Sequence, residues 1–253
     1  MSRRVLVTGG ASGIGRAIVE YFSQEEARIA ICDADAAAVA AFQTEFPEAI
    51  AEVCDVRDEA QMEAFLARVE DAWGGVDVVC ANAGTGGPAG RIEDLDYQAW
   101  QDCVGVNLFG AFLTCRWAAR LMKAQGSGVI SITTSTSGFH GVPYRSPYVA
   151  AKWGLVGLMK TLAMELGPFG VRVNAVAPGA VEGPRMERVL EMEAAADGRD
   201  IEEVRELYAA GTSMRTWVTG DDIAQMVGFL ASDAASKVSG QLMAVDGYTE
   251  RMA

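Results

Sequence analysis

The sequence predicts a single α/β domain over residues 1–253, built as one Rossmann-like, doubly wound parallel sheet of about seven strands with helices on both faces. The chain has 253 residues and 50% hydrophobic composition, enough for one large core. Short, near-continuous apolar runs alternate with longer helical patterns, as in parallel sheets that are covered on both faces. A glycine-rich turn follows the first run, where such folds bind dinucleotides.

The apolar runs predict strands, in chain order, at residues 4–8, 28–33, 49–56, 76–81, 128–133, 171–177 and 241–245. The helical patterns between them provide the crossovers of a doubly wound sheet, at residues 14–24, 58–73, 97–125, 147–167 and 221–231. Ser146 followed by Pro147 predicts the start of the fourth of these helices, with the serine as N-cap.

Residues 184–217 break this alternation with a charged helical insertion between the sixth strand and the last helix. That position lies over the carboxyl ends of the strands, where ligands of doubly wound sheets bind. A substrate lid and a solvated helical hairpin are both compatible with the pattern. We favour the lid because long inserted segments are often functional.

Composition restricts the class of partner and the compartment. With 34 acidic and 21 basic residues the net charge is −13, which disfavours nucleic acids and anionic membranes and favours a small-molecule substrate. Five scattered cysteines without a paired CxxC spacing indicate core thiols in a reducing compartment. No signal core or membrane-spanning run is evident, so we expect a soluble cytoplasmic protein.

The turn "VLVTGGASGIGRAI" predicts a dinucleotide site. Gly9, Gly13 and Gly15 let the backbone approach a pyrophosphate at the start of a helix, whose amides and dipole favour negative charge. Asp33 ends the second strand, where a carboxylate accepts hydrogen bonds from ribose hydroxyls and repels a 2′-phosphate. Ser12 provides no basic residue to offset that repulsion, so NAD is favoured over NADP. Asp35 remains an alternative to Asp33 in register.

Motifs in order over nearly the whole chain resemble the short-chain dehydrogenase/reductase family: "TGGASGIG", "CDV", "NAG", "VNLFG", "TTSTSG", "YVAAK" and "NAVAPG". The resemblance implies a Rossmann-type dehydrogenase that needs no metal and uses a catalytic set of Asn107, Ser135, Tyr148 and Lys152. Ser135 is chosen over Ser131 and Ser137 because it lies thirteen residues before Tyr148 and three before Gly138. The family also implies that Asn107 orders a proton-relaying water and that Lys152 holds the nicotinamide ribose.

The same resemblance implies the cofactor contacts along the sheet edge. Asp55 and Val56 would lie against the adenine, and Pro178 and Gly179 would lead the chain past the nicotinamide. Gly183 stands where many members carry a threonine that contacts the cofactor amide, so backbone atoms near Val181 are expected to replace it. The expected set is Gly9, Ser12, Gly13, Ile14, Gly15, Asp33, Asp55, Val56, Asn82, Ala83, Gly84, Tyr148, Lys152, Pro178, Gly179 and Val181.

The chemistry of the residues supports the assignment of Tyr148 without the family. Tyr148 and Lys152 are four residues apart and share one helix face. A free tyrosine titrates near pH 10, and a neighbouring ammonium lowers its pKa by about 1 to 3 units. Tyr148 is then able to exchange a proton with a substrate hydroxyl while hydride moves to the nicotinamide, with Ser135 holding the substrate oxygen.

Charged and aromatic residues around this motif give a hypothesis for the substrate. Tyr144 and Arg145 immediately precede the helix start, and Arg185 lies at the root of the insertion. Two arginines near one carbinol form a planar clamp for a carboxylate, which suits a hydroxy or sugar acid. Alternatively, Arg145 pairs with a surface carboxylate and Arg185 faces solvent among neighbouring glutamates. His140, the only histidine, either lines the same pocket or makes an incidental loop contact.

The leading hypothesis is an NAD-dependent enzyme that interconverts a secondary alcohol and a ketone on a polar substrate. If the arginine clamp exists, that substrate is an acid. An NADPH-dependent 3-oxoacyl-type ketoreductase is the alternative within the same fold. A sensor or scaffold that binds NAD without turnover is a third hypothesis of a different class. Family resemblance implies a homo-oligomer packed through the two long helices, with a tetramer favoured over a dimer.

Overall fold

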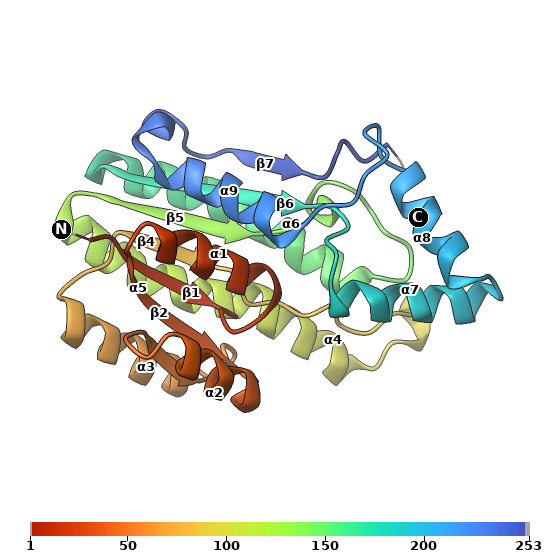
Figure 1. Ribbon diagram of the computed structural model, residues 1–253, viewed down its shortest axis with the longest axis horizontal. Helices are drawn as coiled ribbons and strands as arrows, with labels where there is room; N and C mark the ends of the chain where they lie inside the picture. Colours follow the sequence, from red (N-terminus) through yellow and green to blue (C-terminus); the bar gives the residue numbers. More distant parts are fainter. Residues whose placement is uncertain (1, 251–253) are drawn as a thin grey trace.

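Seven parallel strands form one sheet in the order β3-β2-β1-β4-β5-β6-β7 (Figure 1). The computed structural model describes residues 2–250. The sheet and its covering helices confirm the predicted doubly wound fold. The strands are β1 (Arg4–Thr8), β2 (Arg28–Asp33), β3 (Ile50–Val53), β4 (Val78–Ala81), β5 (Gly128–Thr133), β6 (Val171–Pro178) and β7 (Leu242–Val245).

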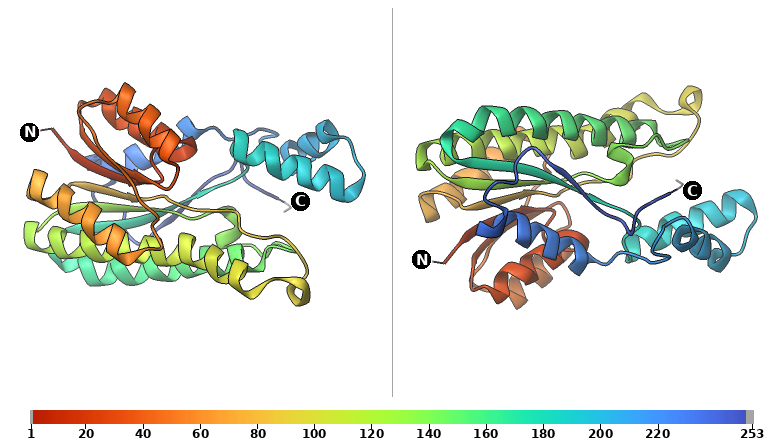
Figure 2. Two further views of the ribbon diagram at one scale, coloured as in Figure 1. Left: turned by 90° about the horizontal axis from the view of Figure 1, so that it is seen from below. Right: turned by 90° about the horizontal axis from the view of Figure 1, so that it is seen from above.

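Helices cover both faces of the sheet (Figure 2). On one face α1 (Gly13–Gln24), α2 (Ala36–Glu45) and α9 (Gly220–Ala231) bury a core that includes Phe22, Phe42 and Ile223. On the other face α3 (Glu59–Trp73), α5 (Gly110–Gln125) and α6 (Ser146–Leu166) bury a core that includes Phe65 and Leu155. Because all seven strands are parallel, the loops that follow them lie together at the carboxyl ends of the strands.

The helix predicted over residues 97–125 is divided into three parts. It runs as α4 (Tyr97–Val104), a π-helical turn over Gly105–Phe109, and α5. Within the turn, Nδ2 of Asn107 donates to the Cys103 carbonyl at 2.8 Å and to the Thr85 carbonyl at 2.9 Å. A side chain that captures the carbonyl one turn back displaces the regular backbone bond, so the helix widens at this residue.

Three local predictions were wrong or incomplete. Strand β3 ends at Val53 instead of residue 56, and α2 was left unassigned because its alanine-rich sequence has no polar face. Ser146 is the first residue of α6 and not its N-cap; Arg145 occupies the cap position and gives no side-chain cap bond. The Ser146 hydroxyl is buried without a hydrogen-bond partner among the described residues.

The helical insertion, residues 184–217, extends beyond the carboxyl ends of the strands (Figure 1). It contains α7 (Pro184–Asp197) and α8 (Ile201–Ala210), which pack on each other around Leu190 and Val204. Arg205 on α8 donates to both carboxylate oxygens of Glu187 on α7, at 3.0 and 2.6 Å. The insertion therefore has a small core and an ion pair of its own.

Two further properties bear on the environment of the protein. The five cysteines are all buried and free. Within residues 2–250, the helices are too short or too polar to cross a membrane.

Candidate active site

The glycine turn between β1 and α1 is shaped for close backbone approach. Gly9 has a φ of 63°, a region that favours glycine, and a Cβ at Gly15 would lie 2.0 Å from the Gly9 carbonyl oxygen. Ser12 is the N-cap of α1, but its side chain makes no cap hydrogen bond. The first amides of α1 are thus left for a ligand, and this geometry fits a pyrophosphate. Ser12 and Gly13 are exposed, whereas Ile14 packs partly into the core.

Asp33, and not Asp35, faces the glycine turn. The Asp33 carboxylate accepts a hydrogen bond from the Ala11 amide at 3.2 Å, which fixes it beside the turn at the end of β2. Asp35 caps α2 by accepting from the Ala37 and Ala38 amides at 2.9 and 3.0 Å. Of the two carboxylates, Asp33 therefore lies against the glycine turn, and Asp35 is used as a helix cap.

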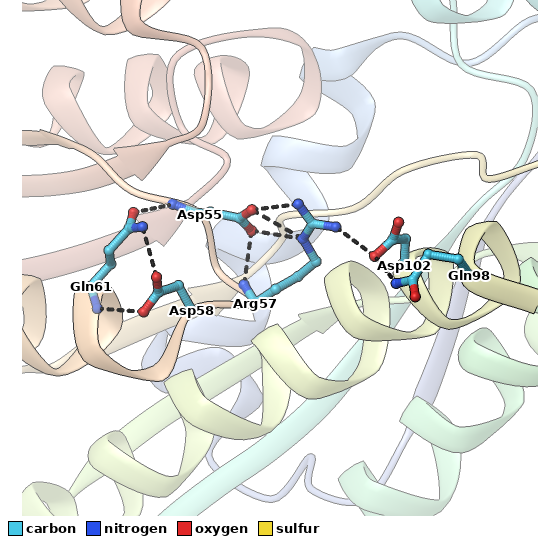
Figure 3. A network of polar contacts seen from close by, with 6 residues as sticks. All are labelled: Asp55, Arg57, Asp58, Gln61, Gln98 and Asp102. Carbon is cyan, nitrogen blue, oxygen red and sulfur yellow. Dashed lines mark hydrogen bonds and ion pairs between the residues drawn. The ribbon is translucent and has the colours of Figure 1, made fainter.

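Asp55 lies two residues after the end of β3 and is held in a polar network (Figure 3). Arg57 donates to its carboxylate, with Nη2 at 2.6 Å from Oδ2, and reaches across to Asp102 on α4 at 2.8 Å. The hydrogen bonds and charge of Arg57 hold the pKa of Asp55 below its ordinary value, against the opposing effect of burial. Val56 is buried against Gly110, so its side chain belongs to the core and only its backbone remains for a cofactor.

Asn82, Ala83 and Gly84 follow β4 and line the middle of the strand ends. The amides of Asn82 and Ala83 both donate to the Thr8 hydroxyl at 3.1 Å, and the Thr133 hydroxyl donates to Oδ1 of Asn82 at 3.0 Å. Asn82 therefore ties β1, β4 and β5 together where they open. Thr8 and Thr133 were missed from the sequence; their position as the last residue of each strand is the signal that would have identified them.

The structure brings Ser135, Tyr148 and Lys152 together. Ser135 follows β5 and lies close enough to Tyr148 to lower its pKa, while Lys152, one turn further along α6, places Nζ 5.5 Å from the centroid of the Tyr148 ring. The Ser137 amide donates to the Ser135 hydroxyl at 3.2 Å and orients it. A hydroxyl, a phenol and an ammonium thus converge at one point above the strand ends.

Burial and charge act in opposite directions on this cluster. Lys152 is only 3% exposed, and its Nζ donates to the Thr133 carbonyl at 3.0 Å. Burial lowers the pKa of Lys152. Burial raises the pKa of Tyr148, but Lys152, Arg185, Ser135 and Arg145 together lower it more, so this pKa lies below its ordinary value.

Asn107 presents a buried oxygen toward the same place. Its side chain is held by the Thr85 and Cys103 carbonyls, but Oδ1 is without a hydrogen-bond partner within the described residues. A Cβ at Gly84 would lie 2.8 Å from that oxygen and 3.5 Å from Nζ of Lys152. The Asn107 oxygen and the Lys152 ammonium therefore both border the position that the missing side chain of Gly84 leaves open.

Arg145 and Arg185 both lie against Tyr148. Their Cζ atoms are 5.2 and 5.8 Å from the centroid of the Tyr148 ring. Nη2 of Arg145 also donates to the Gly86 carbonyl at 3.1 Å. Tyr144 is 60% exposed with a φ of 63° and is outside this contact group. The His140 ring packs edge-on against Phe139, with centroids 4.8 Å apart. The arginines thus join the tyrosine, whereas the described contacts of Tyr144 and His140 are elsewhere.

The chain after β6 passes the cluster as an extended segment. Gly179 is required by close packing, since a Cβ there would lie 2.8 Å from Cβ of Asp246. Val181 forms an isolated parallel bridge with Val218, made through the Ala180 carbonyl and the Glu182 amide. Because that bridge uses neighbouring groups, the amide and carbonyl of Val181 remain available for a carboxamide.

These parts have the arrangement expected of a dinucleotide-binding site at the carboxyl ends of a doubly wound sheet. The family model described as Enoyl-(Acyl carrier protein) reductase matches residues 9–249. The chain belongs to the short-chain dehydrogenase/reductase family, and it is an oxidoreductase that acts on alcohols or ketones with a nicotinamide dinucleotide. The predicted family is confirmed.

Relatives of known structure and activity cover the whole fold. The chain is 36% identical over 251 residues to cis-4-hydroxycyclohexanecarboxylate dehydrogenase of Sinomonas cyclohexanicum, and the match covers 98% of this chain and 96% of that one. The structure of NAD+-bound xylitol dehydrogenase matches with a TM-score of 0.91 and 28% identity, over 97% of this chain and 98% of that chain. The structure of a variant of actinorhodin polyketide ketoreductase with NADPH matches with a TM-score of 0.94 and 33% identity, over 99% and 98% of the two chains.

Proposed function

We propose that this protein is an NAD-dependent dehydrogenase that interconverts a secondary alcohol and a ketone on a polar, carboxylate-bearing substrate. The observation that carries the proposal is the convergence of Ser135, Tyr148 and buried Lys152 at the carboxyl ends of the strands. Bound NAD would supply the hydride acceptor. The substrate carbinol would lie with its oxygen between the hydroxyls of Ser135 and Tyr148.

Each residue of the cluster has a separate part in the proposed reaction. Tyr148, with its lowered pKa, takes the proton of the alcohol during oxidation and returns it during reduction. Ser135 donates a hydrogen bond to the substrate oxygen and stabilises its developing charge. The positive charge of Lys152 stabilises the deprotonated form of Tyr148, and Lys152 also holds the nicotinamide ribose. Asn107 binds the water through which the proton leaves, at its unpartnered Oδ1.

NAD is proposed over NADP because of Asp33. Its carboxylate lies beside the turn, where the extra phosphate of NADP would meet a like charge. Arg16, a cation on the adjoining helix, is paired with Glu20 at 2.7 Å and with Glu45 at 2.5 Å. The relatives include proteins with either cofactor, so an NADPH-dependent ketoreductase is the second candidate function; the likeness to the NADPH-bound ketoreductase favours it.

The proposed substrate is acidic because two arginines flank the reacting tyrosine. The name of the Sinomonas relative describes oxidation of a hydroxyl on a carboxylate-bearing molecule, which supports the same class of substrate here. We propose that the helical insertion covers this substrate as a lid. A NAD-binding sensor without turnover is disfavoured by the convergence of Ser135, Tyr148 and Lys152.

The test is a screen for NADH and NADPH formation from neutral secondary alcohols, polyols, and hydroxy and sugar acids. The proposal expects turnover of at least one class, with higher kcat/KM for NAD than for NADP. Equal or better turnover with NADP would overturn the cofactor assignment and favour the ketoreductase. Binding of NAD without turnover of any alcohol or ketone would favour the sensor.

We further propose a cytoplasmic homotetramer. Phe112 on α5 and Trp153 and Met164 on α6 are 45, 51 and 81% exposed, which leaves apolar surface on the two long helices for a second copy. The buried free thiols fit a reducing compartment. The mass of the native protein in solution tests this assembly, and a monomer at micromolar concentration would contradict it.

A further inference from the structure

The two arginines beside Tyr148 have unsatisfied donors in an acidic chain. Among the side chains that the structure describes, Arg145 and Arg185 form no ion pair, although the net charge of the chain is −13. Nε of Arg145 is buried without a hydrogen-bond partner in the same described region. A buried charged donor costs free energy unless a partner satisfies it, so a ligand is the natural partner.

Both guanidinium groups reach the same point next to the loop that follows β4. A Cβ at Gly86 would lie 3.3 Å from Nη2 of Arg145 and 3.8 Å from Nη2 of Arg185. The absent side chain therefore leaves a space into which both groups project their donors. A planar anion with two oxygens suits such a pair better than a neutral group does.

The arginines differ in how firmly they are held. Arg145 is half-buried and is the cap residue just before α6. It donates to the Gly86 carbonyl at 3.1 Å. Arg185 is exposed and is the second residue of α7, a helix that begins directly after Gly183 with its φ of 137°. Arg145 thus belongs to the start of α6, a helix packed on the sheet, and Arg185 belongs to the helical insertion.

We infer that Arg145 and Arg185 jointly bind the carboxylate of a compact hydroxy acid, Arg145 as a fixed arm and Arg185 as an arm that the helical insertion brings over the substrate. The inference rests on the proposed dehydrogenase activity. Because both cations contact the Tyr148 ring, the acid group must lie only a few bonds from the carbinol carbon. A long acyl chain on a carrier would carry its anionic group too far away.

The kinetic test compares each hydroxy acid with its neutral amide of the same skeleton: lactate with lactamide, 3-hydroxybutyrate with 3-hydroxybutyramide, and 4-hydroxycyclohexanecarboxylate with its carboxamide. The wild type is expected to prefer the best acid over its amide by about 10- to 100-fold in kcat/KM, as charge-assisted hydrogen bonds imply. Arg145→Ala and Arg185→Ala should bring this ratio close to one. Because both arginines also lower the pKa of Tyr148, the amide is expected to be oxidised more slowly than by the wild type, but by less than the loss on the acid. Arg188→Ala, on the exposed face of α7, is the matched control and should keep the preference.

Gly86→Val provides a second test, because it fills the space between the arginines and keeps both charges. It is expected to lower acid turnover more than amide turnover. Titration of the NADH-bound protein with acetate and with acetamide gives a readout that needs no turnover. Acetate should bind more tightly than acetamide, and Arg145→Ala should remove the difference.

The outcomes separate the inference from the proposed function. Oxidation of neutral alcohols with no preference for acids, or full acid preference in both arginine variants, overturns the inference and leaves the dehydrogenase standing. Selective acetate binding that depends on Arg145, in a protein that oxidises no alcohol, supports the anion site and overturns the dehydrogenase. Equal binding of acetate and acetamide overturns the anion site whatever the activity.

Discussion

Two regions at the carboxyl ends of the strands contain arginines, and these arginines differ in their ion-pair partners. Arg57 lies between Asp55 and Asp102, and both carboxylates satisfy its guanidinium at 2.6 and 2.8 Å (Figure 3). Arg145 and Arg185 lie against Tyr148 and are without a carboxylate partner in the described residues. An arginine that is neutralised by its own chain ties elements together. One that is left unpaired beside a reactive group is available to a ligand.

The largest expected effect comes from removing the reactive hydroxyl from the unpaired region. Tyr148→Phe should lower kcat by about 100- to 10,000-fold, the usual contribution of a general acid or base. NAD affinity should stay unchanged, since the ring remains. Tyr97→Phe, at an exposed position on α4, is the control. Steady-state NADH formation and a fluorescence titration with NADH measure both quantities, and wild-type kcat in Tyr148→Phe would refute the proton transfer.

Removing the buried ammonium should be the next most severe change and should alter the pH profile. Alcohol oxidation needs the deprotonated tyrosine, so its rate rises as pH passes the pKa of Tyr148, which lies below its ordinary value. Lys152→Met removes a cation that lowers this pKa, so the rise should move to higher pH and kcat at neutral pH should fall about 10- to 100-fold.

The matched control for this change is Lys160→Met, two turns along α6, where the lysine is exposed. Its profile should match that of the wild type. A Lys152→Met profile that rises at the same pH as the wild type would show that the ammonium does not act on Tyr148.

A smaller effect is expected where the glycine turn meets β2. Asp33→Asn keeps the shape of the side chain and removes its charge, so the ratio of kcat/KM for NAD over NADP should fall about tenfold. Asp35→Asn makes the same change two residues later, at a cap position that asparagine also fills. Its ratio should stay unchanged, and a fall in both variants would assign the effect to net charge instead of Asp33.

The smallest effect is expected in the paired region. Arg57 is 41% exposed, so Arg57→Ala should lower the free energy of unfolding by about 1 kcal/mol or less. Urea denaturation measures this change. Arg68→Ala, which removes a second exposed ion pair, is the control and should give a loss of similar size. The preference for acids over amides should survive in Arg57→Ala. Loss of that preference would remove the distinction between the two regions.

Features that depend on periodic patterns or on residues close together in the sequence were predictable. Continuous apolar runs located all seven strands, and the four-residue spacing placed Tyr148 and Lys152 on one face of α6. The backbone demands of the glycine turn depend on local sequence alone. These features need no knowledge of how distant segments meet, whereas the choice of Asp33 over Asp35 needed the contact between the Asp33 carboxylate and the Ala11 amide.

Features that depend on distant contacts were not predictable in the same way. The π-helical turn depends on Asn107 reaching Thr85, a residue on another loop, and the role of Arg57 depends on Asp102, 45 residues away. Arg145 and Arg185 were identified as candidates, but their convergence depends on the space at Gly86. Side-chain capture of this kind leaves no hydrophobic period to detect.

The most direct measurement is a crystal structure of the protein with NADH and a bound hydroxy acid from the kinetic panel. The account predicts the substrate hydroxyl within hydrogen-bond distance of Ser135 and Tyr148, with its carboxylate between Arg145 and Arg185. A hydroxyl oriented away from Tyr148, or a carboxylate bound elsewhere on the chain, would contradict it.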